Sequence, residues 1–152
     1  MQSAGTFVVE GGHRLKGEIV PQGAKNEALQ VLCAVLLTDQ PVILSNLPAI
    51  RDVAMLIQLI RGLGVEVEQL APDTYRFTAK EVNVDYVLSQ DYIRDASKIR
   101  GSVMLIGPLL ARYGRASLPK PGGDKIGRRR LDTHLLGLEQ LGGHFSFDAD
   151  KN

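Results

Sequence analysis

The order of helical and extended patterns occurs twice along this chain of 152 residues, and that repetition constrains the fold more than any other feature. Matching positions lie about 79 residues apart, as expected for a duplicated structural unit. The matched pairs are Asp52 and Asp132, Leu63 and Leu141, and Val65 and His144. The sequence therefore predicts an α/β fold of repeated βαβαββ units, the first over about 17–80 and the second over about 84–152.

The elements of each unit follow from the local period of the apolar residues. The first unit is predicted to contain a strand at 18–21, a helix over 26–37, a strand at 42–44, a helix over 52–63 and strands at 65–70 and 75–78. The second is predicted to contain an extended stretch at 84–87, a helix over 95–111, a strand at 115–118, a helix over 130–141 and a strand at 144–147. The second unit lacks its last strand, which would leave an unpaired sheet edge. We therefore expect the chain to be an amino-terminal fragment.

Composition excludes several classes of protein. The chain is 44% hydrophobic and 23% charged, which is typical of one globular domain or a large piece of a bigger one. A formal net charge of +1 provides no overall basic field that would attract nucleic acid or an anionic membrane. No apolar run approaches the length of about 20 residues that a membrane span needs. We expect neither nucleic acid nor a membrane span.

Cysteine and histidine give no sign of a metal or disulfide site. The single cysteine, Cys33, lies within an apolar run and is predicted to be a buried structural residue. The three histidines, His13, His134 and His144, do not have the spacing of metal ligands. With no signal-peptide pattern at the start, the sequence predicts a cytoplasmic protein without a metal or cofactor.

A first candidate anion site follows the predicted strand at 18–21. Gly23, Ala24, Lys25 and Asn26 stand where a strand ends and a helix begins, and backbone N–H groups face a ligand crevice at such a place. Lys25 would contribute a positive charge, and Asn26 would hydrogen-bond a hydroxyl. The alternative is a plain helix start with Asn26 as the cap and Lys25 in water.

Arg100 is a second candidate. It is followed by Gly101 and Ser102, which form helices poorly but allow a close approach to a ligand. The alternative for Arg100 is an ion pair with Asp91 or Asp95.

The densest positive stretch runs from Pro121 to Asp132. It combines three glycines, the carboxylate of Asp124 and four cations, ahead of a helix whose amino end favours anions. The sequence therefore predicts a small, strongly anionic ligand, and the alternative is a solvated surface connection with exposed lysine and arginine side chains. Asp132 is predicted either to cap that helix or lie in its first turn, or to accept from a sugar hydroxyl or a uracil N–H.

Together, these stretches resemble the UDP-N-acetylglucosamine 1-carboxyvinyltransferase family, the enolpyruvyl transferases of peptidoglycan synthesis. The residues that carry the resemblance are Gly23 to Asn26, Pro121 to His134, and Gly137 to Gly142. The resemblance implies two domains arranged as an inside-out α/β barrel that is incomplete in this chain. Residues 1–22 would be an amino-terminal strand and hinge region associated with the other domain, and residues 23–152 a partial βαβαββ-repeat domain.

The resemblance also implies a role for each candidate residue. Lys25, Arg100 and Arg129 match the family's cationic anchors for phosphoenolpyruvate, and Asn26 matches a residue near the sugar hydroxyl. Arg129 and Asp132 lie in the segment that resembles the UDP-sugar contact. The implied reaction is transfer of the enolpyruvyl group from phosphoenolpyruvate to the 3-hydroxyl of UDP-N-acetylglucosamine, by addition and then elimination of phosphate.

Three positions depart from the common pattern of the family. Asp124 stands where many members have cysteine and some have aspartate, and it is the implied general acid. Because fosfomycin alkylates that cysteine, Asp124 predicts resistance to the drug. Arg130 replaces a common proline and Met104 a common tryptophan. The alternative function is a non-catalytic anion- or UDP-sugar-binding module or assembly fragment.

Overall fold

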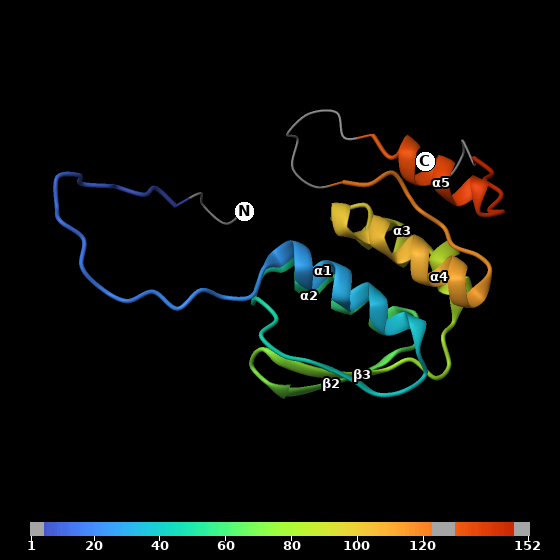
Figure 1. The fold of residues 1–152 in the computed structure, drawn as a ribbon, viewed down its shortest axis with the longest axis horizontal. Helices are drawn as coiled ribbons and strands as arrows, with labels where there is room; N and C mark the ends of the chain where they lie inside the picture. The colour runs from blue at the N-terminus through green and yellow to red at the C-terminus, as the bar shows by residue number, and fades with distance from the viewer. Residues whose placement is uncertain (1–4, 123–129, 148–152) are drawn as a thin grey trace.

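The computed structural model describes residues 5–122 and 130–147, and Figure 1 shows their arrangement. The strands are β1 (Val42–Leu44), β2 (Glu66–Ala71) and β3 (Thr74–Thr78). The α-helices are α1 (Lys25–Ala34), α2 (Arg51–Gly62), α3 (Gln90–Ala96), α4 (Ile106–Tyr113) and α5 (Asp132–Gln140). Three 3₁₀ helices are η1 (Val35–Leu37), η2 (Val84–Leu88) and η3 (Arg100–Leu105).

The three strands form one antiparallel sheet with the order β1-β3-β2. Phe77 of the central strand pairs with Val42 on one side and Val67 on the other, and its side chain is buried. The helices lie on one side of this sheet (Figure 1). The fold is therefore a mixture of helix and sheet, and the predicted α/β class is confirmed.

The core lies between the helices and the sheet. On α2, the buried residues Val53, Leu56, Ile57 and Ile60 follow the helical spacing that the sequence predicts. Each large apolar side chain that is removed from water in this way contributes about 1.5–3 kcal/mol to folding. Helix α1 packs against both α2 and η3, so one core joins the two halves of the described chain.

Arg112 ties the end of η1 to α4. Its guanidinium donates hydrogen bonds to the carbonyl oxygens of Leu36 (3.0 Å) and Thr38 (2.9 Å). Both carbonyls lie where a helical segment ends and backbone acceptors lack helical partners. One side chain of α4 therefore provides hydrogen-bond donors to the carbonyls at the end of a helical segment that lies about 75 residues earlier in the chain.

The first predicted unit is largely confirmed, with one correction. The strand at 42–44 forms with the predicted bounds, and both helices and the β2–β3 hairpin lie within one or two residues of their expected limits apart from the 3₁₀ end of the first helix. The predicted strand at 18–21 is wrong, because residues 5–22 contain no helix or strand and are exposed. A strand needs a hydrogen-bonding neighbour, and none of the described strands pairs with this segment.

The second predicted unit is confirmed only in its helical parts. The stretch at 84–87 is the 3₁₀ helix η2, because the Asn83 side chain accepts a hydrogen bond from the backbone N–H of Asp85 (3.1 Å) and starts a helical turn. The single helix predicted over 95–111 is instead divided into the end of α3, η3 and α4, with Gly101 in the interrupted part. Helix α5 forms, but the strands at 115–118 and 144–147 do not.

Candidate functional site

Lys25 is the first residue of α1, and its position depends on a close approach made by Gly23. A Cβ atom on Gly23 would lie 2.0 Å from the carbonyl oxygen of Asn46, so only glycine fits there. Asn46 itself adopts a left-handed conformation with φ of 57°. The residue that caps α1 is Ala24, which makes no side-chain cap bond. The alternative in which Asn26 caps this helix is therefore wrong, and Asn26 is an exposed residue of its first turn.

The ammonium of Lys25 lies 2.8 Å from a carboxylate oxygen of Asp52, the second residue of α2. Both side chains remain partly exposed. Helices α1 and α2 pack together, and this ion pair joins their amino ends. The positive ends of two helix dipoles therefore meet beside Lys25.

Arg100 is the first residue of η3 and is half-buried. The backbone that follows it lies against α1, because a Cβ atom on Gly101 would stand 2.9 Å from the Leu29 side chain. Leu29 is one helical turn beyond Lys25. The structure therefore brings the Arg100 segment beside the first turns of the helix that begins with Lys25.

The start of the glycine-rich cationic loop lies against the same region. A Cβ atom on Gly122 would stand 1.8 Å from the carbonyl oxygen of Ser97, three residues before Arg100. The predicted loop residues Asp124 and Arg129 lie outside the described residues. Gly122, the last described residue before that loop, lies against the backbone of Ser97 and Lys98, two to three residues before Arg100.

Asp95 organises the charges just ahead of this segment. Its buried carboxylate accepts hydrogen bonds from Lys98 (2.7 Å), Arg94 (3.0 and 3.1 Å) and the Gln58 amide (3.3 Å). The hydrogen bonds from Arg94 and Lys98 lower the pKa of Asp95 to about 2, although burial acts in the opposite direction. Arg94 also pairs with Asp91 (2.7 Å). Both carboxylates that the sequence offered as partners of Arg100 thus have other cations bound to them.

Asp132 begins α5, and its carboxylate pairs with Arg130. Leu131 occupies the cap position, so Asp132 is a first-turn residue and not the cap. A carboxylate in the first turn is stabilised by the helix dipole.

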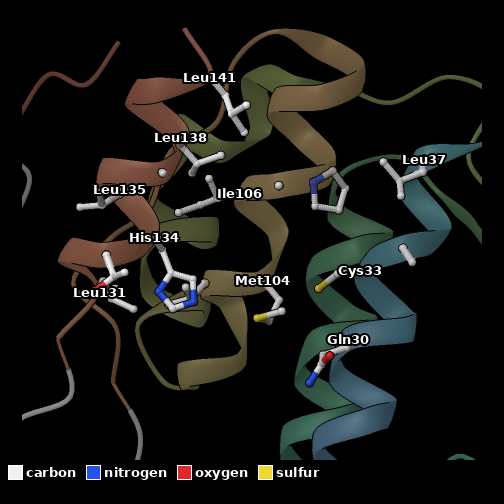
Figure 2. A pocket seen from close by; sticks show the side chains of 16 residues that line it. Gln30, Cys33, Leu37, Met104, Ile106, Leu131, His134, Leu135, Leu138 and Leu141 are labelled. Carbon is white, nitrogen blue, oxygen red and sulfur yellow. The ribbon is translucent and has the colours of Figure 1, made fainter. Parts of the chain in front are cut away.

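A cavity of about 440 Å³ lies elsewhere, between α1, the η3–α4 segment and α5. Figure 2 shows Leu135, Leu138 and Leu141 on the α5 side, with Gln30 and Cys33 on the opposite side. Its lining is almost entirely apolar and includes neither Lys25 nor Arg100. This cavity is therefore not the candidate anion site.

Cys33 is buried, and burial raises the pKa of its thiol to about 12. It has the structural role that the sequence predicts, because a thiol of such high pKa is not a nucleophile near neutral pH. Among residues 5–122 and 130–147, no group of three or more histidine, cysteine, aspartate or glutamate side chains is arranged to hold a metal. The helices in the same ranges are too short or too polar to cross a membrane.

The ion pair between Asp52 and Lys25 was not predicted from the sequence. The repeat contained a signal for it, because Asp52 and Asp132 are matched positions. Both turn out to lie in the first turn of a helix and to pair with a cation, Lys25 in one unit and Arg130 in the other.

Comparison with solved structures defines the class of the fold. The enolpyruvyl transferase NikO from Streptomyces tendae matches 92% of this chain and 30% of its own, with a TM-score of 0.71 and 25% sequence identity. The fold is that of an enolpyruvyl transferase. The chain belongs to the family described as EPSP synthase (3-phosphoshikimate 1-carboxyvinyltransferase), which matches residues 9–152.

Comparison with curated relatives indicates a more specific group of enzymes within this family. The UDP-N-acetylglucosamine 1-carboxyvinyltransferases of Bacteroides fragilis and Bacteroides thetaiotaomicron are 54% and 56% identical to this chain over 96% of its length. The enzyme of the same name from Bradyrhizobium diazoefficiens is 52% identical over 90%. The chain spans about a third of the length of these relatives, between 31% and 34%.

Proposed function

We propose that the protein, in its naturally expressed full length, transfers the enolpyruvyl group of phosphoenolpyruvate to the 3-hydroxyl of UDP-N-acetylglucosamine and releases phosphate. The reaction is the first committed step of peptidoglycan synthesis and takes place in the cytoplasm. Support comes from the relatives that bear this activity in their names and share more than half of their residues with this chain over the region compared.

The cations supply the binding chemistry. Lys25, Arg100 and Arg129 hold the phosphate and carboxylate of phosphoenolpyruvate and offset charge as it develops in the transition state. Asn26 hydrogen-bonds the acceptor sugar, and Arg129 and Asp132 contact the UDP-sugar.

The reaction is an addition followed by an elimination. The sugar 3-hydroxyl attacks C2 of phosphoenolpyruvate while C3 takes a proton, for which Asp124 is the general acid. The 3-hydroxyl proton is lost as the sugar oxygen bonds to C2. Loss of a proton from C3 and departure of phosphate from C2 then restore the C2–C3 double bond. No cofactor or metal takes part in this scheme.

The remainder of the site comes from a second domain. Residues 1–22 are assigned to that domain and its hinge, and residues 23–152 to a partial βαβαββ-repeat domain. The exposed, unpaired course of residues 5–22 supports the assignment, since several apolar side chains there, among them Phe7 and Ile19, have no burial within the described chain.

One observation carries the proposal. The backbone at Gly101, next to Arg100, lies against Leu29 of α1, and the backbone at Gly122, just before the cationic loop, lies against the Ser97 carbonyl. These contacts support the proposal that cations from stretches far apart in sequence meet at one ligand with two acidic groups.

The test is phosphate release by the full-length protein when both substrates are present. We expect Lys25→Met to lower kcat/KM for phosphoenolpyruvate by about 10²-fold or more, since a charged contact at the reacting groups is lost. Lys80→Met removes an exposed lysine outside the site and should stay within about twofold of wild type. Binding of both substrates without phosphate release would favour the alternative, a non-catalytic binding module.

A further inference from the structure

We infer that Asp52 is a positioning residue that holds the Lys25 ammonium in place for phosphoenolpyruvate, an inference that rests on the proposed function. The two groups are 2.8 Å apart and come from the amino ends of two different helices. Neither the family description nor the names of the relatives assign a role to this carboxylate.

The place of Lys25 in the fold is unfavourable for a cation. Lys25 is the first residue of α1, where the helix dipole has its positive end, and the amino end of α2 lies beside it. The dipole of α1 therefore gives the Lys25 ammonium no electrostatic stabilisation. Asp52 offsets both dipoles, because its carboxylate lies in the first turn of α2 and within contact of the Lys25 ammonium.

A lysine side chain also has four rotatable bonds and a compact charge, so it is not aimed by its own shape. Half of the Lys25 side chain is exposed (49%), compared with a third of Asp52 (34%). Asp52 is therefore the more buried partner, and it has the shorter side chain, so the ion pair holds the ammonium beside the amino ends of the two helices. Partly exposed ion pairs contribute little to stability, so the main effect of this one is on the placement of Lys25.

The backbone around the pair is also fixed. Gly23, two residues before Lys25, lies against the Asn46 carbonyl, and the Leu47 N–H donates to the Asp73 carbonyl (2.9 Å). The loop that leads to Asp52 is thus anchored both to the segment before α1 and to the hairpin. Asp52, in the first turn of the helix that follows this anchored loop, orients a flexible Lys25, and orientation of charged groups at the substrate is a major source of rate enhancement.

The experiment compares Asp52→Asn, Asp52→Glu and Glu68→Gln in the full-length protein. Asp52→Asn should lower kcat/KM for phosphoenolpyruvate by about tenfold and leave the KM for UDP-N-acetylglucosamine within about twofold. Asp52→Glu keeps the charge and should recover activity to within about threefold of wild type. Glu68→Gln breaks a comparable ion pair with Arg76 (2.6 Å) on the β2–β3 hairpin and should change neither constant.

A double-mutant cycle separates positioning from a structural role. If Asp52 acts through Lys25, adding Asp52→Asn to Lys25→Met should change kcat/KM by less than about twofold. Independent, multiplicative effects would overturn the inference. An Asp52→Asn variant with an unchanged or higher kcat/KM for phosphoenolpyruvate would also overturn it, because Asp52 would then only compete with the substrate for Lys25.

The behaviour of the wild-type protein distinguishes failure of the proposed function from failure of the inference about Asp52. Wild type that releases phosphate supports the proposed function, and the variants then decide the role of Asp52. If wild type releases no phosphate, the proposed function fails. Calorimetric titration of phosphoenolpyruvate into the same variants then tests the role of Asp52: a tenfold loss of affinity in Asp52→Asn supports the inference, and unchanged affinity overturns it. Wild type that does not bind phosphoenolpyruvate overturns both claims.

Discussion

Gly23 lies so close to Asn46 that a single added carbon would stand 2.0 Å from the Asn46 carbonyl oxygen. This contact joins the segment before α1 to the loop before α2, and therefore sets the distance between the two helix starts that carry Lys25 and Asp52. A backbone oxygen cannot turn away as a flexible side chain can. The geometry of the candidate site thus depends on the absence of a side chain at position 23.

Gly23→Ala is expected to destabilise the protein by about 2 kcal/mol and to weaken phosphoenolpyruvate binding, since the two helix starts must separate. Gly137→Ala is the matched control. Gly137 lies within α5 with no atom within 4 Å of an added Cβ, so alanine should stabilise that helix by about 0.5–1 kcal/mol. Urea unfolding measures both changes, and equal effects of the two substitutions would contradict the prediction.

Leu56→Ala should cost about 2–5 kcal/mol, because Leu56 is fully buried on the core face of α2. Leu136, on α5, is more than half exposed (55%). Leu136→Ala should change the free energy of unfolding by less than about 0.5 kcal/mol. Denaturant titrations of both variants test this core, and a Leu56→Ala variant as stable as wild type would show that α2 does not pack as described.

The contribution of Asp95 to stability should depend on pH. The pKa of Asp95 is lowered from 3.8 to about 2 by Arg94 and Lys98, so the folded protein binds its proton less readily than the unfolded chain does. The resulting stabilisation is complete above about pH 5 and is lost as pH falls through 4 towards 2. Asp95→Asn should therefore cost about 2 kcal/mol at pH 6, and the difference from wild type should shrink steadily below pH 4. A difference that is constant from pH 6 to pH 3 would contradict this assignment.

Resistance to fosfomycin is expected from Asp124, because a carboxylate attacks an epoxide far less readily than a thiolate does. Mass spectrometry of the full-length protein after incubation with the drug should show no adduct. Asp124→Cys introduces the cysteine that many members of the UDP-N-acetylglucosamine 1-carboxyvinyltransferase family have at this position. This variant should form one stoichiometric adduct with fosfomycin. A stoichiometric adduct on Asp124 in wild type would defeat the prediction.

Cys33 should not interfere with that measurement. Burial raises the pKa of its thiol to about 12, so iodoacetamide at pH 8 should label it at least about 10²-fold more slowly than in the urea-unfolded chain. Rapid labelling of the native protein, followed by mass spectrometry, would show that α1 opens readily from the core.

The parts of the fold that the sequence predicted are those that local pattern determines. The spacing of Val53, Leu56 and Ile60 identifies α2 without any knowledge of its neighbours. The strands predicted at 18–21, 115–118 and 144–147 failed for the opposite reason, since strand formation depends on a hydrogen-bonding neighbour that a local pattern does not contain. Gly101, in the stretch between α3 and α4, lies against Leu29 of α1, a contact that is also non-local.

The residues of the candidate site also divide into those that local pattern identifies and those that only packing identifies. Lys25 and Arg100 stand out from their local context of glycines and helix starts, and the structure brings their segments together. Asp52 could not be selected in this way, because an aspartate in the first turn of a helix is common and only the packing of α1 on α2 brings it to Lys25. The roles of all the candidate residues, Lys25, Asn26, Arg100, Asp124, Arg129 and Asp132, are predictions.

Arg112 places a requirement on sequence variation in this fold. Its guanidinium bonds two carbonyl oxygens at once, those of Leu36 and Thr38, by donating from a single planar nitrogen group. The same guanidinium lies over the Tyr113 ring, 5.1 Å from its centroid, and a lysine ammonium cannot stack on an aromatic face in this way. Functional variants selected from a randomised library at position 112 should therefore retain arginine far more often than lysine, although the residue lies outside the proposed site.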